Sequence, residues 1–180
     1  MKNTKIKKNL FLCIFFICSF CAFSLPAGYG TVKLGMSIEE VKTELKKNSD
    51  FGYRGDRDVS LLPSTKETII ETDASKNPYS FFSRCWFQFI DGELFSITLN
   101  LNNEKLDYFG IYSSLAKKYG TPAEINPSLA KWNDSKTIMS LEKPLTLKYI
   151  DAQKLKALEE KSGVQKTYEE KTVEDFLDSL

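Results

Sequence analysis

Few residues of this chain have side chains that could do covalent or metal chemistry. The 180 residues include no histidine, which removes Ser-His-Asp, Cys-His and histidine–metal sites. Only one cysteine, Cys85, lies outside residues 1–24. It falls in an aromatic, strand-like run, where a cysteine ordinarily serves as a small buried hydrophobe. No phosphate-binding glycine loop or EF-hand pattern occurs. We therefore expect no catalytic residue, no metal and no cofactor.

The same run carries the best candidate for a binding surface. Phe82, Arg84 and Trp86 alternate in it, so in a strand they would share one face. Tryptophan and arginine are favoured at the centres of protein interfaces, and we expect these three residues to contact a partner. The alternative is that a helix or the C-terminal tail covers this face and makes Trp86 part of a second small core.

A β-hairpin over residues 79–101 must position these side chains. Both arms are rich in aromatic and β-branched residues, and Asp91-Gly92 lies between them. We predict a three-residue turn over residues 90–92 with Gly92 left-handed, which places Phe87 opposite Phe95. The face predicted to be buried comprises Phe81, Ser83, Cys85, Phe87, Phe89, Phe95, Ile97, Leu99 and Leu101. A shift of one residue would expose this whole set.

The remaining elements predict an α+β fold. Ser37 and Glu40 form a capping-box pattern for a helix, and a second helix is expected over residues 103–119, ending at Gly120. Strands are predicted over residues 66–72, 137–141 and 145–150, and residues 121–134 read as a connection. Helices follow over residues 151–161 and 172–180. The expected architecture is an antiparallel sheet of about five strands packed on one face by helices, in the order helix, strands, helix, strands, helices.

The N-terminus predicts export. Residues 1–24 carry four lysines and no acid, and an apolar run over residues 10–23 is followed by small residues suited to cleavage before Leu25. A retained membrane anchor is the alternative, although the run is short for a span. Lipidation is disfavoured because Cys18 and Cys21 follow bulky residues. We expect a signal peptide (residues 1–24), a single α+β domain (25–150) and a charged helical extension (151–180).

Charge after cleavage argues against nucleic acid as a partner. Without the four lysines of the signal peptide, 21 basic and 24 acidic residues remain, a net charge of −3, whereas nucleic-acid binding calls for a basic excess. The remaining 156 residues can bury a core without disulfides.

Three short motifs resemble a known group of proteins. Residues 34–41 (LGMSIEEV) are similar to the opening of small periplasmic domains of the SmpA/OmlA family, which share an architecture with the β-lactamase inhibitor protein. The helix ending over residues 119–122 (YGTP) and the hairpin residues 94–97 (LFSI) are also similar. The resemblance implies a helix-backed antiparallel sheet that binds proteins in the cell envelope without catalysis. It implies no particular functional residue, because the matching positions are caps and turns.

The expected function is therefore a non-catalytic periplasmic or envelope protein that acts as a protein-binding or scaffold module. One alternative is a periplasmic protein that binds a small ligand, or acts as an enzyme, in a pocket between sheet and helices. A second is a membrane-tethered subunit or lipoprotein. The expected partner is another envelope protein, and the membrane is contacted only through the signal segment if it is not cleaved.

Overall fold

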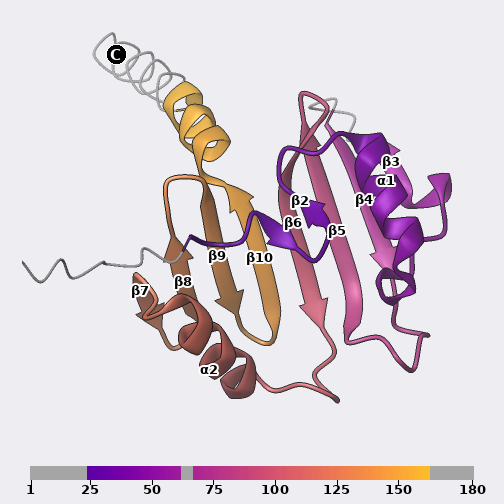
Figure 1. Cartoon of the computed structure of the whole chain (residues 1–180). Helices are drawn as coiled ribbons and strands as arrows, with labels where there is room; N and C mark the ends of the chain where they lie inside the picture. The colour runs from indigo at the N-terminus through magenta and orange to yellow at the C-terminus, as the bar shows by residue number, and fades with distance from the viewer. Residues whose placement is uncertain (1–23, 62–66, 163–180) are drawn as a thin grey trace, which may run out of the picture.

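The computed structural model describes residues 24–61 and 67–162 (Figure 1). The predicted signal segment and the predicted helix over residues 172–180 lie outside these ranges, apart from Ser24. The fold is α+β, with one eight-stranded antiparallel sheet and one two-stranded ribbon. The elements, in chain order, are β1 (Gly28–Tyr29), β2 (Val32–Lys33), α1 (Ile38–Lys47), two 3-10 turns (Ser49–Phe51 and Asp56–Asp58), β3 (Val59–Leu61), β4 (Thr68–Asp73), β5 (Phe82–Ile90), β6 (Glu93–Leu101), α2 (Tyr108–Tyr119), β7 (Glu124–Asn126), β8 (Leu129–Asn133), β9 (Thr137–Glu142), β10 (Thr146–Asp151) and a helix over residues 152–162.

The large sheet is built from two halves of the same outline. Its strand order is β3-β4-β5-β6-β10-β9-β8-β7, so α1 and the four strands after it form one half, and α2 and its four strands form the other. The last strands of the halves, β6 and β10, pair at the centre. The expectation of about five strands was too low, and the order was wrong in that a β1–β2 ribbon precedes α1.

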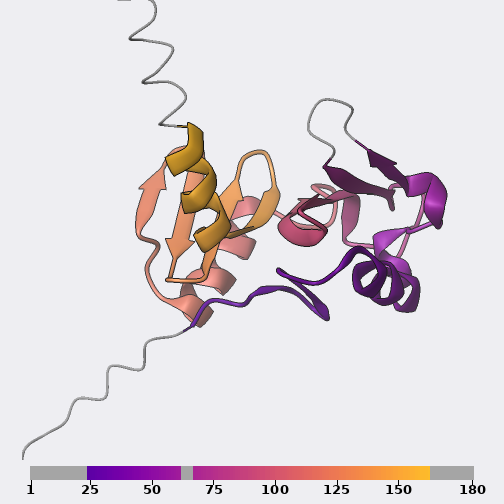
Figure 2. The same cartoon turned by 90° about the horizontal axis from the view of Figure 1, so that it is seen from above.

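Both labelled helices lie on one face of the sheet, with the β1–β2 ribbon between them (Figures 1 and 2). Val41 and Leu45 of α1 are buried in the core, and the ring of Tyr112 on α2 lies 6.2 Å from that of Trp132 on β8. The helix over residues 152–162 continues from β10 and projects past the end of the sheet (Figure 1).

The helix boundaries follow their caps. The predicted capping box is confirmed: Glu40 accepts from the backbone N–H of Ser37 at 2.8 Å, and the Ser37 hydroxyl accepts from the backbone N–H of Glu40. The predicted start of α2 near residue 103 was wrong. Asp107 is the cap, because its carboxylate accepts from the N–H of Gly110 at 2.8 Å.

The β5–β6 hairpin turns through two residues, and the predicted three-residue turn was wrong. Ile90 pairs with Glu93, and Asp91 and Gly92 have φ of 53° and 81°. Positive φ at both central positions is the geometry that matches the twist of a hairpin. A bulge at the next step then makes Phe87 face Ile97 instead of Phe95. Because of this bulge, odd-numbered residues of β5 beyond it pair with odd-numbered residues of β6, as the predicted turn also required.

A second irregularity corrects the assignment of Phe82. Phe82 pairs with Leu101 but Arg84 pairs with Asn100, so Ser83 is an extra residue that interrupts the alternation of faces. Phe82 is therefore on the buried face and only 3% exposed, whereas Phe81, predicted to be buried, is 54% exposed.

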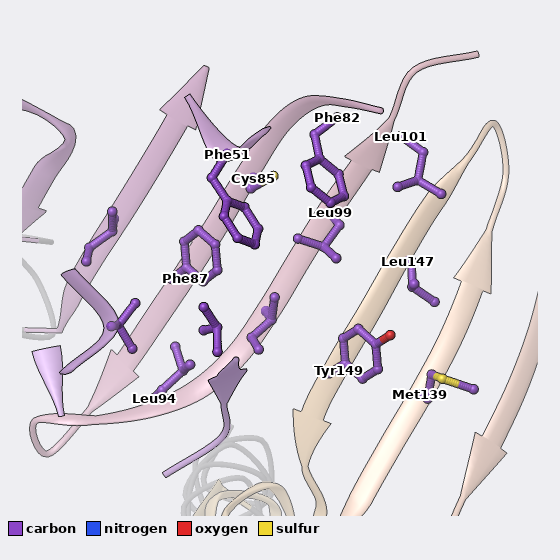
Figure 3. Packing of buried hydrophobic residues seen from close by; sticks show 14 of the residues in the cluster. Phe51, Phe82, Cys85, Phe87, Leu94, Leu99, Leu101, Met139, Leu147 and Tyr149 are labelled. Atoms are coloured by element: carbon purple, nitrogen blue, oxygen red, sulfur yellow. The ribbon is translucent and has the colours of Figure 1, made fainter. Parts of the chain in front are cut away.

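The core fills the face beneath the helices (Figure 3). Paired positions place one buried row straight across the sheet: Ile70, Phe87, Ile97, Tyr149, Met139 and Trp132. Cys85 is fully buried in the adjacent row, as predicted. The ring of Phe82 stacks on Phe51, with centroids 5.2 Å apart and planes at 6°.

Candidate functional site

The face of the sheet opposite the helices forms the first candidate surface, which we call the open face. Residues that pair across antiparallel strands point to the same side, and one row of the open face runs through Glu71, Trp86, Thr98, Lys148, Ser140 and Lys131. Within residues 24–61 and 67–162, both labelled helices lie on the other side. Neither α1 nor α2 therefore covers Trp86 (Figures 1 and 2), and the tail beyond residue 162 lies outside the described residues.

Two of the three predicted site residues meet on the open face. Trp86 is half-buried and is the large aromatic of its row, and Arg84 is exposed on the same strand. Arg84 Nη1 lies 3.4 Å from Glu71 Oε1, with both side chains about half exposed. Such an exposed pair contributes little stability, so the guanidinium can exchange Glu71 for a partner's acceptor. Phe82 does not belong to this site.

The surroundings of Trp86 are polar and hydrogen-bonded. Gln88 Nε2 donates to Glu67 at 3.0 Å and Gln88 Oε1 accepts from Ser96 at 3.3 Å. Farther along the sheet, Lys148 lies 2.7 Å from Glu142. A half-buried tryptophan ringed by satisfied polar groups has the composition of a protein–protein contact, in which an aromatic anchor is surrounded by a polar rim.

A pocket on the helix face forms the second candidate site. Its volume is about 610 Å³, and it lies between the β1–β2 ribbon, α2 and the centre of the sheet. Leu101, Leu147 and Tyr149 contribute from the strands, and Ile111 and Leu115 contribute from α2. Sequence reasoning placed a pocket between sheet and helices only as an alternative, and it did not identify the lining. The signal it missed is Gly28, where a Cβ would lie 2.3 Å from the carbonyl oxygen of Val32 in the ribbon and 3.0 Å from the Ile97 side chain.

The Cys85 thiol is not poised as a nucleophile in the folded chain. Burial raises the pKa of the Cys85 thiol to about 12, so the thiol is neutral near pH 7 and a weak nucleophile. Among the described residues, no group of three or more histidine, cysteine, aspartate or glutamate side chains is arranged to hold a metal ion. The open face carries a half-buried aromatic among charged and polar groups, and the pocket has an apolar lining bordered by lysines.

Comparison with known proteins assigns the family. The model of the TP0088 domain matches residues 27–161, which is most of the chain. The chain belongs to the TP0088 domain family. The TP0088 domain match spans β1 to the helix after β10, so it contains the open face and every lining residue of the pocket except Pro26. None of the curated proteins and none of the solved structures compared gives a significant match. Among residues 24–61 and 67–162, no helix is both long and apolar enough to cross a membrane.

Proposed function

We propose that this protein is a non-catalytic, protein-binding module of the cell envelope, exported by its N-terminal signal segment. The observation that carries the proposal is the position of Trp86, half-buried on the sheet face opposite both labelled helices, next to the exposed Arg84. A large aromatic on a polar sheet face stabilises a monomer only in part, but it supplies much of the binding energy in an interface.

Further features support the proposal. The motifs similar to SmpA/OmlA-like periplasmic domains are those of a helix-backed sheet that binds proteins, and the fold has that layout in each half. The open face also carries both signs of charge, with Glu71, Arg84 and Lys148 within three neighbouring strand pairs. Mixed charge favours a specific partner, because a wrong partner leaves charges unmatched.

Site-specific photo-crosslinking in intact cells tests the proposal. A photoreactive residue at position 84 samples the open face, and one at Lys46, exposed on α1, samples the helix side. We expect a protein adduct from position 84 and none from position 46. Adducts only from position 46 would overturn the assignment of the open face.

Substitutions then identify the anchor. Trp86→Ala should abolish the adduct, whereas Lys131→Ala, in the same row but on β8, should leave it intact. Glu71→Lys, at the exposed position that pairs with Trp86, serves as a second variant in case Trp86→Ala impairs folding. Retention of the adduct in both Trp86→Ala and Glu71→Lys, with native circular dichroism, would refute the proposal.

A further inference from the structure

The pocket on the helix face has an apolar interior that opens at an apolar mouth. Leu101 and Leu147 of the sheet and Leu115 of α2 line it, and the volume of about 610 Å³ falls in the range of small-molecule sites. At its edge, Tyr29 is 37% exposed and Phe81 is 54% exposed. The apolar lining of the cavity therefore continues outwards onto two exposed aromatic rings.

Positive charge borders this apolar space. Lys33 on β2 and Lys118 on α2 are both lining residues, and no acidic residue lines the pocket among the described residues. A third lysine, Lys105, lies with its Nζ 5.8 Å from the centroid of the Phe81 ring, and it donates to the carbonyl of Ser80 at 2.7 Å. Asp50 raises the pKa of Tyr29 through its charge, after the larger effect of burial, but it does not line the pocket.

The ammonium groups of Lys33 and Lys118 come from different walls of the pocket, the first from the β1–β2 ribbon and the second from α2. Lys33 follows the buried Val32 in β2, and Lys118 lies in the last turn of α2, with its Nζ 5.1 Å from the centroid of the Tyr119 ring. Lysine side chains with long apolar stems can lie along an apolar wall and hold the ammonium at its rim. An apolar cavity with two cations and no lining carboxylate is complementary to a molecule with an apolar chain and an anionic head.

We propose that this pocket binds a single-chain anionic amphiphile. The alkyl chain lies between α2 and strands β6 and β10, and the carboxylate or phosphate head pairs with Lys33 and Lys118. This site lies on the sheet face opposite Trp86, so it is distinct from the protein-binding surface proposed above.

The first experiment fills the cavity. Binding of laurate, below its micelle concentration, is measured by titration calorimetry with the full chain. Ser114→Trp places a bulky ring at a lining position of α2, and Ser113→Trp places it at the neighbouring exposed position, which does not line the pocket. We expect saturable binding that Ser114→Trp weakens by about tenfold or more, equivalent to about 1.4 kcal/mol, and that Ser113→Trp leaves unchanged. Equal binding by both variants would overturn the proposal, as would no binding by the wild type.

The second experiment tests the charge. Laurate is compared with 1-dodecanol and dodecyltrimethylammonium, which have the same chain length with a neutral or cationic head. The double variant Lys33→Glu/Lys118→Glu should lose affinity for laurate and gain it for the cationic probe, whereas Lys117→Glu, exposed on the same helix outside the lining, should change neither. Equal affinity of the wild type for laurate and dodecyltrimethylammonium would refute the anionic head. All variants retain the N-terminal apolar segment. Laurate bound to that segment would therefore give the same affinity in every variant, and a difference between variants reports binding in the pocket.

Discussion

Phe82 offers the sharpest test of how the hairpin is built, because sequence alone placed it on the wrong face. In the structure its side chain is 3% exposed, stacked on Phe51 and edge-on to Tyr29 with centroids 5.2 Å apart in each pair. Phe82→Ala should therefore remove a core residue. Replacing a buried phenylalanine by alanine costs about 3–5 kcal/mol.

The position of Phe82 fixes where in that range the cost falls. The residue also lines the helix-face pocket, so the space left by its ring joins an existing cavity, and neighbouring side chains can relax into it. We therefore expect about 3 kcal/mol, the lower end of the range for such a truncation. At about 2–4 °C per kcal/mol for a domain of this size, the midpoint of thermal unfolding should fall by roughly 6–12 °C.

Thermal and urea unfolding followed by circular dichroism measure the effect. Arg84→Ala is the matched control on the same strand, because the exposed Arg84 makes only a 3.4 Å pair with Glu71, and its change should stay within about 0.5 kcal/mol. Phe82→Leu, which keeps apolar volume, should fall between the two. Equal destabilisation by Phe82→Ala and Arg84→Ala would show that the bulge at Ser83 is absent and that both side chains share a face.

Further predictions concern buried polar groups. Asp58→Asn should lower the free energy of unfolding by about 2–3 kcal/mol in urea titrations, because the fully buried carboxylate accepts three bonds from Arg54; an effect under 0.5 kcal/mol would contradict this. The Cys85 thiol, whose pKa burial raises to about 12, should react with iodoacetamide only as the protein unfolds, and its contribution to stability should be lost as pH rises above about 9; prompt labelling of the native chain would refute its burial. Burial raises the pKa of Asp134, but hydrogen bonds from backbone N–H groups, including that of Leu25 at 2.8 Å, outweigh this effect. The net result is a pKa below the usual value for aspartate. Asp134 therefore stabilises the fold above pH about 4 and loses this effect at lower pH, so Asp134→Asn should flatten the acid limb of a stability–pH curve, and an unchanged limb would contradict the prediction. Cleavage before Leu25 would create an ammonium beside that carboxylate, so Asp134→Asn should lower the melting temperature of the processed chain more than that of the full chain.

Long, strongly patterned elements were predictable, and short ones stabilised by distant partners were not. The capping box of α1 and the strands β4, β9 and β10 follow from local sequence alone. By contrast, β7 spans only Glu124–Asn126, with all three residues exposed. Its neighbour β8 was read as loop, although Trp132 on it donates from Nε1 to the carbonyl of Gly120 at 2.8 Å. Contacts of this kind arise only after the chain has folded back.

The dependence on contacts between distant residues also limited how much of the candidate site could be predicted. Period-two alternation correctly placed Arg84 and Trp86 on the face opposite Cys85. It failed at Phe82 because a bulge adds one residue without any composition signal, and the Ser83 hydroxyl that donates to Asn100 O at 3.2 Å is visible only in the folded hairpin. The pocket was beyond sequence reasoning because its walls come from residues 26–33, 81–119 and 147–149.

The two-half construction gives a physical reason why the two candidate sites lie close to the middle of the sheet on opposite faces. Each half has one helix on the same side of the sheet (Figure 1), and the two halves join at the centre, where β6 pairs with β10. On the helix side the small β1–β2 ribbon lies between the helices (Figure 1), and the pocket opens between this ribbon and α2. On the other side the same central strands extend the row of Trp86 through Thr98 to Lys148. Because β6 contributes Leu101 to the pocket and Thr98 to the open face, a ligand between α2 and β6 can alter the strand that supports Trp86. Occupancy of the pocket by laurate should therefore change the fluorescence of Trp86 in a Trp132→Phe background, and an unchanged spectrum at saturation would show that the two faces are independent.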